Sequence, residues 1–424
     1  MADEKSTNPS LRPPLHGYHD GDGDGSSSWV LLDLYPYIAD RKNSTSASAM
    51  MRGGDKIRVT LCAAPPPLVS YVCVWCPGLP ASEIYKATLE AAESDLLLVR
   101  VTLVSRDPHG EFFVYKASSK GACPLLRPLH VPLDCLRRRN HIGLLAHTDV
   151  AGALPRGEDD DAGIRSHGPG GGVRLHPYRD GDAIRFRPHD EGLDHYFVAA
   201  LCYKTCTDET STTTFNLWVY NSTDDKWTAS PISLHGTPPP RQLDRAGTRC
   251  YLPVPEQISW YTRCPDEAQL ARDAVLVDGR LTLVDLCYLD ATCSTWEVSA
   301  WSKGVFSSDE GWCHDYEVLS RDILIDGDTE NASLLPRIKD GQGAVRPTLE
   351  GLHIAHPVLS LTASHVVYIM AKVGIDDTKA LLLSVDMRNK KQQAVSMFDG
   401  ERMFGMFSYT CTQSRIPGYF NPAV

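Results

Sequence analysis

One local pattern constrains the fold of this chain more than any other. A short apolar strand, a polar turn and a returning strand occur together four times along the sequence. The four strands are residues 112–115, 217–220, 283–286 and 383–386, and three of the returns are marked by Trp227, Trp296 and Val395. Repeated hairpins must bury their apolar faces against one another, which limits the chain to a sandwich, a barrel or a propeller.

Other segments of strand length support this expectation. Runs rich in β-branched and aromatic residues cover 95–105, 111–116, 195–203, 213–220, 274–286, 366–373 and 380–386, whereas only 81–94 and 267–273 are helix candidates. A strand, a turn and an aromatic residue on the return are typical of the outer half of a kelch-like blade. We therefore predict a mainly β, propeller-like fold. The spacing of the units is irregular, so an irregular β-sandwich is the alternative.

Composition suggests where the ordered domain begins. Residues 1–28 form an acidic, Gly- and Ser-rich segment with few apolar side chains, and such a segment cannot offset its ordering entropy by burial. We predict a disordered tail over 1–28 and a single large propeller-like domain over 29–424. A second acidic and Gly-rich stretch predicts a flexible loop at 157–172.

Charge and hydropathy exclude several classes of protein. A formal net charge of -11 argues against nucleic-acid binding, which needs excess Lys and Arg. No apolar run approaches the ~18 residues of a membrane span, and the first thirty residues lack the apolar core of a secretory signal. We expect an intracellular protein, cytoplasmic or nuclear, whose 13 cysteines are mostly reduced and buried.

Two cysteine pairs are weak candidates for a metal site. Cys73 and Cys76 are spaced as C-x-x-C, and Cys202 and Cys206 could complete a four-thiolate set. Residues three apart on a strand point to opposite faces, so buried strand cysteines are the favoured interpretation. The pair His353 and His356 meets the same objection and is interpreted as loop histidines.

Motifs that would specify a reaction are missing from the sequence. It contains no Gly-x-x-x-x-Gly-Lys-Ser/Thr phosphate loop, no Gly-x-Gly-x-x-Gly after a strand and no Gly-x-Ser-x-Gly elbow. The sequence therefore predicts no catalytic residue, no cofactor and no metal ligand beyond the weak cysteine candidates.

Several collinear strings resemble a known family. They include Trp29-Val-Leu-Leu-Asp33, Cys76-Pro-Gly78, Arg272-Asp-Ala-Val-Leu-Val-Asp-Gly-Arg280 and His356-Pro-Val-Leu-Ser360. Together they resemble the plant, grass-expanded domain of unknown function family numbered sixteen-eighteen, which is related in style to kelch-like and F-box-associated repeats. The resemblance implies a plant intracellular protein of uncharacterised role with no assigned catalytic residues.

One departure from that family concerns the segment between residues 220 and 274. A strand pair that its members usually carry is not readable there, where the chain runs through Thr237-Pro-Pro-Pro240. A missing pair would leave one blade incomplete, with an exposed sheet edge.

Three functional hypotheses follow from these observations. The first is a non-enzymatic interaction module that binds an unknown protein partner, but neither nucleic acid nor membrane, through loops held by a rigid β scaffold. The alternative is a hydrolase-like enzyme whose site is assembled from distant loops of a propeller. The third is a degenerate paralogue.

Overall fold

The computed structural model describes residues 8–17, 27–106, 108–117, 123–132, 141–146, 195–204, 214–233, 255, 268–277, 279–289, 294–304, 311–325, 330–339, 343–402, 407 and 411–420. The chain divides into two compact units, one of Met1–Leu129 with Pro253–Val424 and one of His130–Leu252. The predicted single domain over 29–424 stays a prediction. The loop predicted at 157–172 lies outside the described residues.

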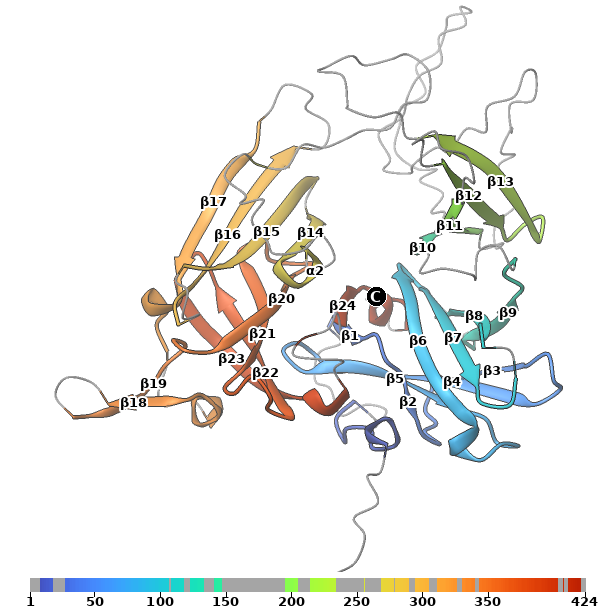
Figure 1. Ribbon diagram of the computed structural model, residues 1–424, viewed down its shortest axis with the longest axis horizontal. Coiled ribbons are helices and arrows are strands. Elements are labelled where there is room, and N and C mark those ends of the chain that lie inside the picture. Colours follow the sequence, from blue (N-terminus) through green and yellow to red (C-terminus); the bar gives the residue numbers. More distant parts are fainter. Residues whose placement is uncertain are drawn as a thin grey trace, which may run out of the picture. The chain divides into compact units, whose positions relative to one another are not determined.

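Four sheets of four or more strands make up the described part of the first unit (Figure 1). The first sheet contains β1 (Val30–Asp33), β2 (Tyr37–Ile38), β3 (Ala47–Met50), β4 (Lys56–Cys62), β5 (Val69–Trp75) and β24 (Cys411–Ser414). Its strand order is β24-β1-β5-β4-β3, with β2 paired to β5. The antiparallel pairing of β1 with β24 therefore joins the two ends of the chain in one sheet.

The other three sheets are antiparallel meanders of consecutive strands. One contains β6 (Ile84–Glu93), β7 (Leu96–Leu103), β8 (Glu111–Lys116) and β9 (Leu125–Leu129). A short helix, α2 (Ala268–Ala271), precedes the next, which contains β14 (Arg272–Val277), β15 (Arg280–Tyr288), β16 (Trp296–Gly304) and β17 (Cys313–Leu319). The last contains β20 (His353–Leu359), β21 (Val366–Lys372), β22 (Lys379–Asp386) and β23 (Lys391–Asp399).

Separate apolar clusters join these sheets in series. One lies between the first sheet and β6–β9 and includes Val59 and Phe113. A second joins the first sheet to β20–β23 through Leu31 and Leu382. A third joins β20–β23 to β14–β17 and includes Trp296. Each sheet thus buries a face against a neighbouring sheet, as the blades of a propeller do.

The second unit contains one further sheet among its described residues. It is an antiparallel meander of β10 (His141–Ala146), β11 (Tyr196–Lys204), β12 (Thr214–Asn221) and β13 (Lys226–Ser233). Tyr196, Val198, Ala200 and Cys202 are buried at alternate positions of β11. This period of two is typical of a strand that packs on one face.

The predicted mainly β, propeller-like fold class is confirmed. All four predicted strand–turn–strand units are present, as β8–β9, β12–β13, β15–β16 and β22–β23. Three of them are the third and fourth strands of their sheets, as an outer half-blade requires, whereas β15–β16 are the second and third. A strand pair was expected to be missing between residues 220 and 274, and most of that interval lies outside the described residues. The two sheets on either side of it, β10–β13 and β14–β17, have four strands each.

Two local predictions are wrong. Residues 81–94 form a 3-10 turn (Ala81–Glu83) and β6 instead of a helix. Two β-bulges in β6 break its alternation, so the apolar positions acquire a spacing that resembles a helical one. Residues 274–286 are two strands, β14 and β15, because the chain turns at Gly279, whose φ is +73°. The second helix candidate is confirmed over Ala268–Ala271.

The tail predicted over residues 1–28 is not disordered throughout. Residues 8–17 include a 3-10 turn (Pro9–Leu11), and backbone carbonyls of Pro14 and His16 accept hydrogen bonds from the Tyr71 side chain. Hydrogen bonds to the backbone, which composition does not reveal, hold this segment on the first sheet.

Candidate functional site

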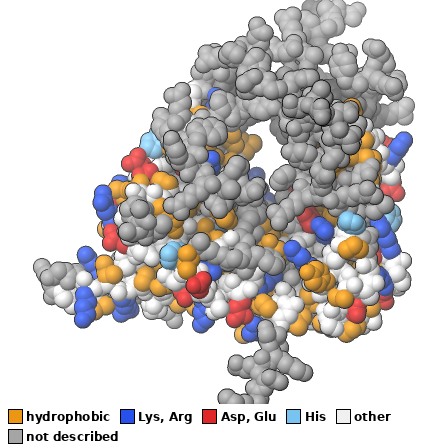
Figure 2. Space-filling model, viewed as in Figure 1, with side chains coloured by type: hydrophobic (Ala, Val, Ile, Leu, Met, Phe, Trp, Pro, Cys, Tyr) orange, Lys and Arg blue, Asp and Glu red, His pale blue; other side chains and the backbone are white. Residues whose placement is uncertain are grey.

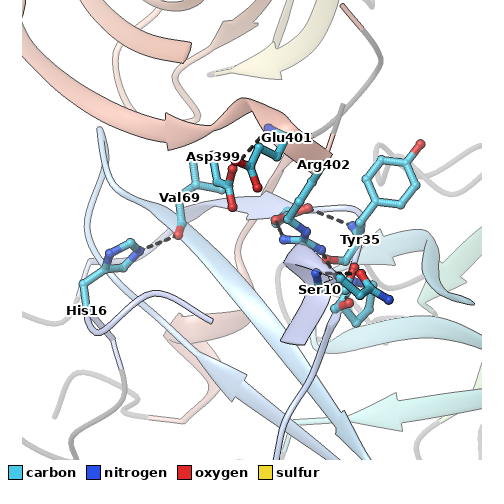
Figure 3. A network of polar contacts seen from close by, with 10 residues as sticks. Ser10, His16, Tyr35, Val69, Asp399, Glu401 and Arg402 are labelled. Atoms are coloured by element: carbon cyan, nitrogen blue, oxygen red, sulfur yellow. Dashed lines mark hydrogen bonds and ion pairs between the residues drawn. The ribbon is translucent and has the colours of Figure 1, made fainter. Parts of the chain in front are cut away.

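A buried ion pair lies where β1 ends. We call Asp33 and Arg402 the closure pair, because they join the first strand to the 3-10 turn that follows β23 (Gly400–Arg402). Arg402 Nη1 lies 2.6 Å from Asp33 Oδ2, and both side chains are 3% exposed. Arg402 Nη2 also donates to the Tyr35 carbonyl (Figure 3). The guanidinium carbon of Arg402 lies 3.6 Å from the centroid of the Tyr37 ring.

Burial controls the ionisation of this region. It raises the pKa of the Asp33 carboxyl, while Arg402 and the Tyr35 N–H oppose that rise. It also raises the pKa of Tyr37 to about 12. An ion pair removed from water in this way is stable only while both partners remain, since either charge alone would be uncompensated.

A thiol cluster, formed by Tyr37, Cys62, Tyr71 and Cys73, adjoins the closure pair. The Tyr37 and Tyr71 rings meet edge to face with centroids 5.2 Å apart. Cys62 on β4 lies opposite Tyr71 on β5, and Thr60 lies opposite Cys73. The two cysteines are therefore diagonal neighbours on one face of the sheet, where they are 0% and 1% exposed.

The surroundings of these thiols favour one thiolate. A hydrogen bond from Cys73 lowers the pKa of the Cys62 thiol, and Tyr71 and the Arg41 charge lower it further against the effect of burial. The same thiol–thiol bond, together with burial, raises the pKa of Cys73. The first proton therefore leaves the pair more easily than the second.

The segment of residues 13–17 lies over the thiol cluster. The Tyr71 hydroxyl lies 2.7 Å from the Pro14 carbonyl oxygen and 3.0 Å from that of His16. His16 Nε2 in turn lies 2.9 Å from the Val69 carbonyl oxygen (Figure 3). Gly17 has a φ of +70°, and a Cβ placed there would lie 2.8 Å from the Ala63 carbonyl oxygen, so the segment fits closely only with glycine at this position.

Replacing Gly17 with alanine is expected to expose both thiols of the cluster. The added Cβ contacts the backbone at Ala63, and alanine at residue 17 would have a disfavoured positive φ. Together these effects cost about 1–2 kcal/mol, which increases the population of molecules with the segment lifted by roughly 5- to 30-fold. Alkylation of Cys62 and Cys73 by iodoacetamide, followed by peptide mass spectrometry, should accelerate by that factor. Gly54→Ala is the matched control, because Gly54 has a φ of +85° and open space around it. Equal acceleration in both variants would contradict the covering role of the segment.

The cysteines singled out from the sequence are not brought together. Cys73 belongs to the thiol cluster, whereas Cys76 lies in the core between the first sheet and β6–β9, with its Sγ 3.8 Å from Met51 Sδ. Cys202 lies on β11 in the second unit, and Cys206 lies outside the described residues. Among the residues that the structure describes, no group of three or more His, Cys, Asp or Glu could hold a metal ion.

The histidine pair does not lie in a loop, contrary to the expectation. Both residues belong to β20, where a bulge between Ala355 and Pro357 accommodates His356 at a φ of +56°. Burial lowers the pKa of His356 to about 4, so this imidazole is neutral at physiological pH.

Five residues of the site were missed from the sequence: Asp33, Tyr37, Cys62, Tyr71 and Arg402. No sequence motif marks these residues. The pairing of β4 with β5 brings Cys62 next to Tyr71, and the 3-10 turn after β23 brings Arg402 to Asp33. The alternation of apolar residues in β4 and β5 could have placed Cys62 and Cys73 on like faces, but the register between the strands was not readable.

No helix in the described part of the chain has the length and apolar character needed to cross a membrane.

The similarity of this chain to known proteins is limited. No curated protein matches the sequence. Among solved structures, the chain is similar to an alpha-L-arabinanase from Penicillium chrysogenum in complex with arabinobiose, at 11% identity over 88% of this chain and 99% of that one. The TM-score of this comparison is 0.16.

One family model matches the sequence, and its description is "Protein of unknown function (DUF1618)". The match covers residues 242–368, which include β14–β19, β20 and the first residues of β21. Residues 242–368 therefore match the DUF1618 family of unknown function, the family that the sequence motifs resemble.

Proposed function

We propose that the protein is a non-enzymatic interaction module and that an exposed β-hairpin within the DUF1618 segment contacts its partner. The hairpin consists of β18 (Arg337–Lys339) and β19 (Val345–Pro347), which pair only with each other among the described strands. It extends away from the neighbouring sheets in Figure 1. A two-stranded hairpin without a further strand beside it gains little stability from its own pairing, so a partner that adds a strand or a surface would stabilise it.

The base of the hairpin is fixed to the core of the first unit. Leu335 and Leu349 flank the two strands and are buried in the cluster between β14–β17 and β20–β23. The Thr348 N–H donates to the Pro336 carbonyl at 2.9 Å. The hairpin is thus presented from a rigid base, an arrangement that suits recognition.

Its surface is both basic and apolar (Figure 2). Arg337, Lys339 and Arg346 are exposed, and none of them forms an ion pair with a described residue. Ile338 and Val345 are 40% and 55% exposed, although both are strand residues that favour burial. This local charge is opposite to the net charge of -11 of the whole chain.

These features favour an acidic, extended segment of a partner protein as the occupant. Carboxylates would pair with the three cations, and β-branched side chains would cover Ile338 and Val345. The open strand edges offer unpaired backbone groups to an added strand. We also propose an intracellular location, in keeping with the reduced cysteines expected there.

Charge reversal of the hairpin tests this function. The probe is a fluorescein-labelled peptide of alternating Glu and Val, titrated with the full chain and followed by fluorescence anisotropy. We expect Arg337→Glu, Lys339→Glu and Arg346→Glu together to weaken binding at least about tenfold, because three attractive contacts become repulsive. Binding to the unaltered chain should also weaken as salt is raised, because the contacts are exposed.

A matched control removes the effect of net charge. Lys56→Glu, Arg127→Glu and Lys379→Glu change three exposed cations on other strands by the same amount. Equal loss of binding in the control set would show a non-specific charge effect and would count against the hairpin.

A further inference from the structure

The N-terminal segment of residues 8–17, which we call the strap, lies on the first sheet and is held there mainly through its backbone. The Tyr71 hydroxyl donates to the carbonyl oxygens of Pro14 and His16, at 2.7 Å and 3.0 Å. Arg41 Nη2 donates to the Pro13 carbonyl oxygen at 3.4 Å. Every residue carries a backbone carbonyl, whatever its side chain. Another segment with the same backbone conformation would therefore find the same donors on this surface.

The conformation of the strap follows from its two adjacent prolines. Their rings fix the φ angles of Pro13 and Pro14 at about −65°. Pro13 also precedes a proline, which disfavours the helical region and favours polyproline II. A polyproline II chain has no internal hydrogen bonds, so its carbonyls are open to donors from outside. Proline-rich segments are recognised in this conformation by grooves lined with aromatic side chains.

The surface under the strap has the aromatic character of such a groove. The Tyr71 ring meets the His16 ring edge to face with centroids 5.7 Å apart, and it meets the Tyr37 ring at 5.2 Å. The Arg41 guanidinium carbon lies 5.9 Å from the centroid of the Tyr71 ring. Tyr71 is therefore both an apolar wall and a hydrogen-bond donor of this surface. Tyrosine suits both roles, because it has an apolar ring and a polar tip.

The strap itself gains little from burial. None of the side chains of residues 8–17 is buried, and its two leucines, Leu11 and Leu15, are 38% and 86% exposed. An ion pair between Arg12 and Glu401 links the strap to the 3-10 turn after β23, but these side chains are 54% and 42% exposed. Such an exposed pair adds little stability. The strap therefore holds this surface chiefly because the chain connects it to β1, which raises its effective concentration there.

We propose that the surface under the strap is a docking site for a proline-rich segment of a partner protein, and that the strap is its intramolecular competitor. The bound segment adopts polyproline II, and its carbonyl oxygens accept the hydrogen bonds that Tyr71 and Arg41 now donate to the strap. A basic residue directly before the prolines pairs with Glu401, as Arg12 does in the strap. This occupant differs from the acidic segment proposed for the β18–β19 hairpin, so the two surfaces take different partners.

The test supplies the strap sequence as a separate molecule. The probe is a fluorescein-labelled peptide with the sequence of residues 8–17, titrated with the full chain and followed by fluorescence anisotropy. Its apparent dissociation constant equals the intrinsic one divided by the fraction of chains whose strap is lifted. Gly17→Ala should therefore tighten peptide binding by roughly 5- to 30-fold, the factor expected for lifting of the strap. Gly54→Ala is the matched control and should bind the peptide as the unaltered chain does.

A second variant lifts the strap by charge and leaves its glycine in place. Arg12→Glu replaces the ion pair with a repulsion from Glu401, at an exposed position where the fold of the first unit is not at risk. We expect the peptide to bind about two- to fivefold more tightly to this variant than to the unaltered chain, because an exposed pair is worth little.

Two further changes test the features that are recognised. Tyr71→Phe keeps the ring and removes the donor, so adding it to Gly17→Ala should weaken peptide binding about tenfold. A peptide with Pro13→Ala and Pro14→Ala should also bind about tenfold more weakly, because it loses the preformed conformation.

Three results would overturn the proposal. They are equal binding of the two peptides, no gain in peptide binding by Gly17→Ala and Arg12→Glu, and a dimer of Gly17→Ala in size-exclusion chromatography, which would identify a second copy of this chain as the occupant. The charge reversals in the hairpin leave Tyr71 and Arg41 in place and should not change peptide binding, so the two proposals fail independently.

Discussion

Arg402→Met is expected to lower the free energy of unfolding by about 3–5 kcal/mol, the loss typical of removing one partner of a buried ion pair. Asp33 would remain buried with the Tyr35 N–H as its hydrogen-bond donor. The carbonyl oxygens of Tyr35 and Pro36 would also lose a cationic donor. Urea unfolding of the full chain measures the loss.

The deficit in this variant should depend on pH. Burial already raises the pKa of Asp33, and Arg402 opposes that rise, so loss of Arg402 raises the pKa further. A carboxyl whose folded pKa lies above its unfolded value binds its proton more tightly when folded. Stability is therefore retained at low pH and lost as pH rises through the folded pKa, so the deficit should shrink as pH is lowered from neutral toward the unfolded pKa of about 3.9.

A double variant provides the control for the closure pair. Asp33→Asn combined with Arg402→Met removes both charges and should recover part of the loss. If Arg402→Met costs less than about 1 kcal/mol, as an exposed pair would, the description of Asp33 and Arg402 as a buried pair is wrong.

Trp296→Ala is expected to destabilise the first unit by about 3–5 kcal/mol, as other removals of a buried aromatic side chain do. Trp296 is 0% exposed and belongs to the cluster between β14–β17 and β20–β23. Its Nε1 donates to the Leu349 carbonyl at 3.0 Å, which links β16 to the base of the β18–β19 hairpin. Chemical denaturation followed by the fluorescence of the remaining tryptophans measures the effect.

Trp296→Phe separates packing from the hydrogen bond. Phenylalanine fills most of the same volume but leaves the Leu349 carbonyl without this donor, which costs about 1–3 kcal/mol for a buried group. The alanine variant should therefore be the less stable of the two. Equal losses in the two variants would mean that the hydrogen bond, which both variants remove, and not the apolar contact dominates at this position.

Much of the architecture was predictable from local pattern. The pattern of an apolar strand, a polar turn and a returning strand correctly predicted four hairpins, because a hairpin is encoded within about a dozen residues. They are β8–β9, β12–β13, β15–β16 and β22–β23. The failure at 81–94 also has a local cause. Bulges in β6 shift the inward-facing positions, and a period of two was no longer visible there.

The candidate site was beyond such reasoning, because it is made by long-range pairing. Arg402 meets Asp33 only when β24 and the preceding turn return to β1, and Cys62 meets Cys73 only in the register of β4 with β5. The C-x-x-C spacing of Cys73 and Cys76 drew attention to the wrong neighbour, since residues three apart on a strand point to opposite faces.

The pairing of β1 with β24 has a consequence for biosynthesis. Val30 pairs with Ser414, so the first sheet stays incomplete until residues 411–414 have left the ribosome. Until then β1 exposes a free edge that other strands could occupy. Contacts so distant in sequence also form slowly, because loop closure precedes any gain in stability. Production of this protein should therefore be sensitive to chaperone supply during translation, more than its strand content alone would suggest.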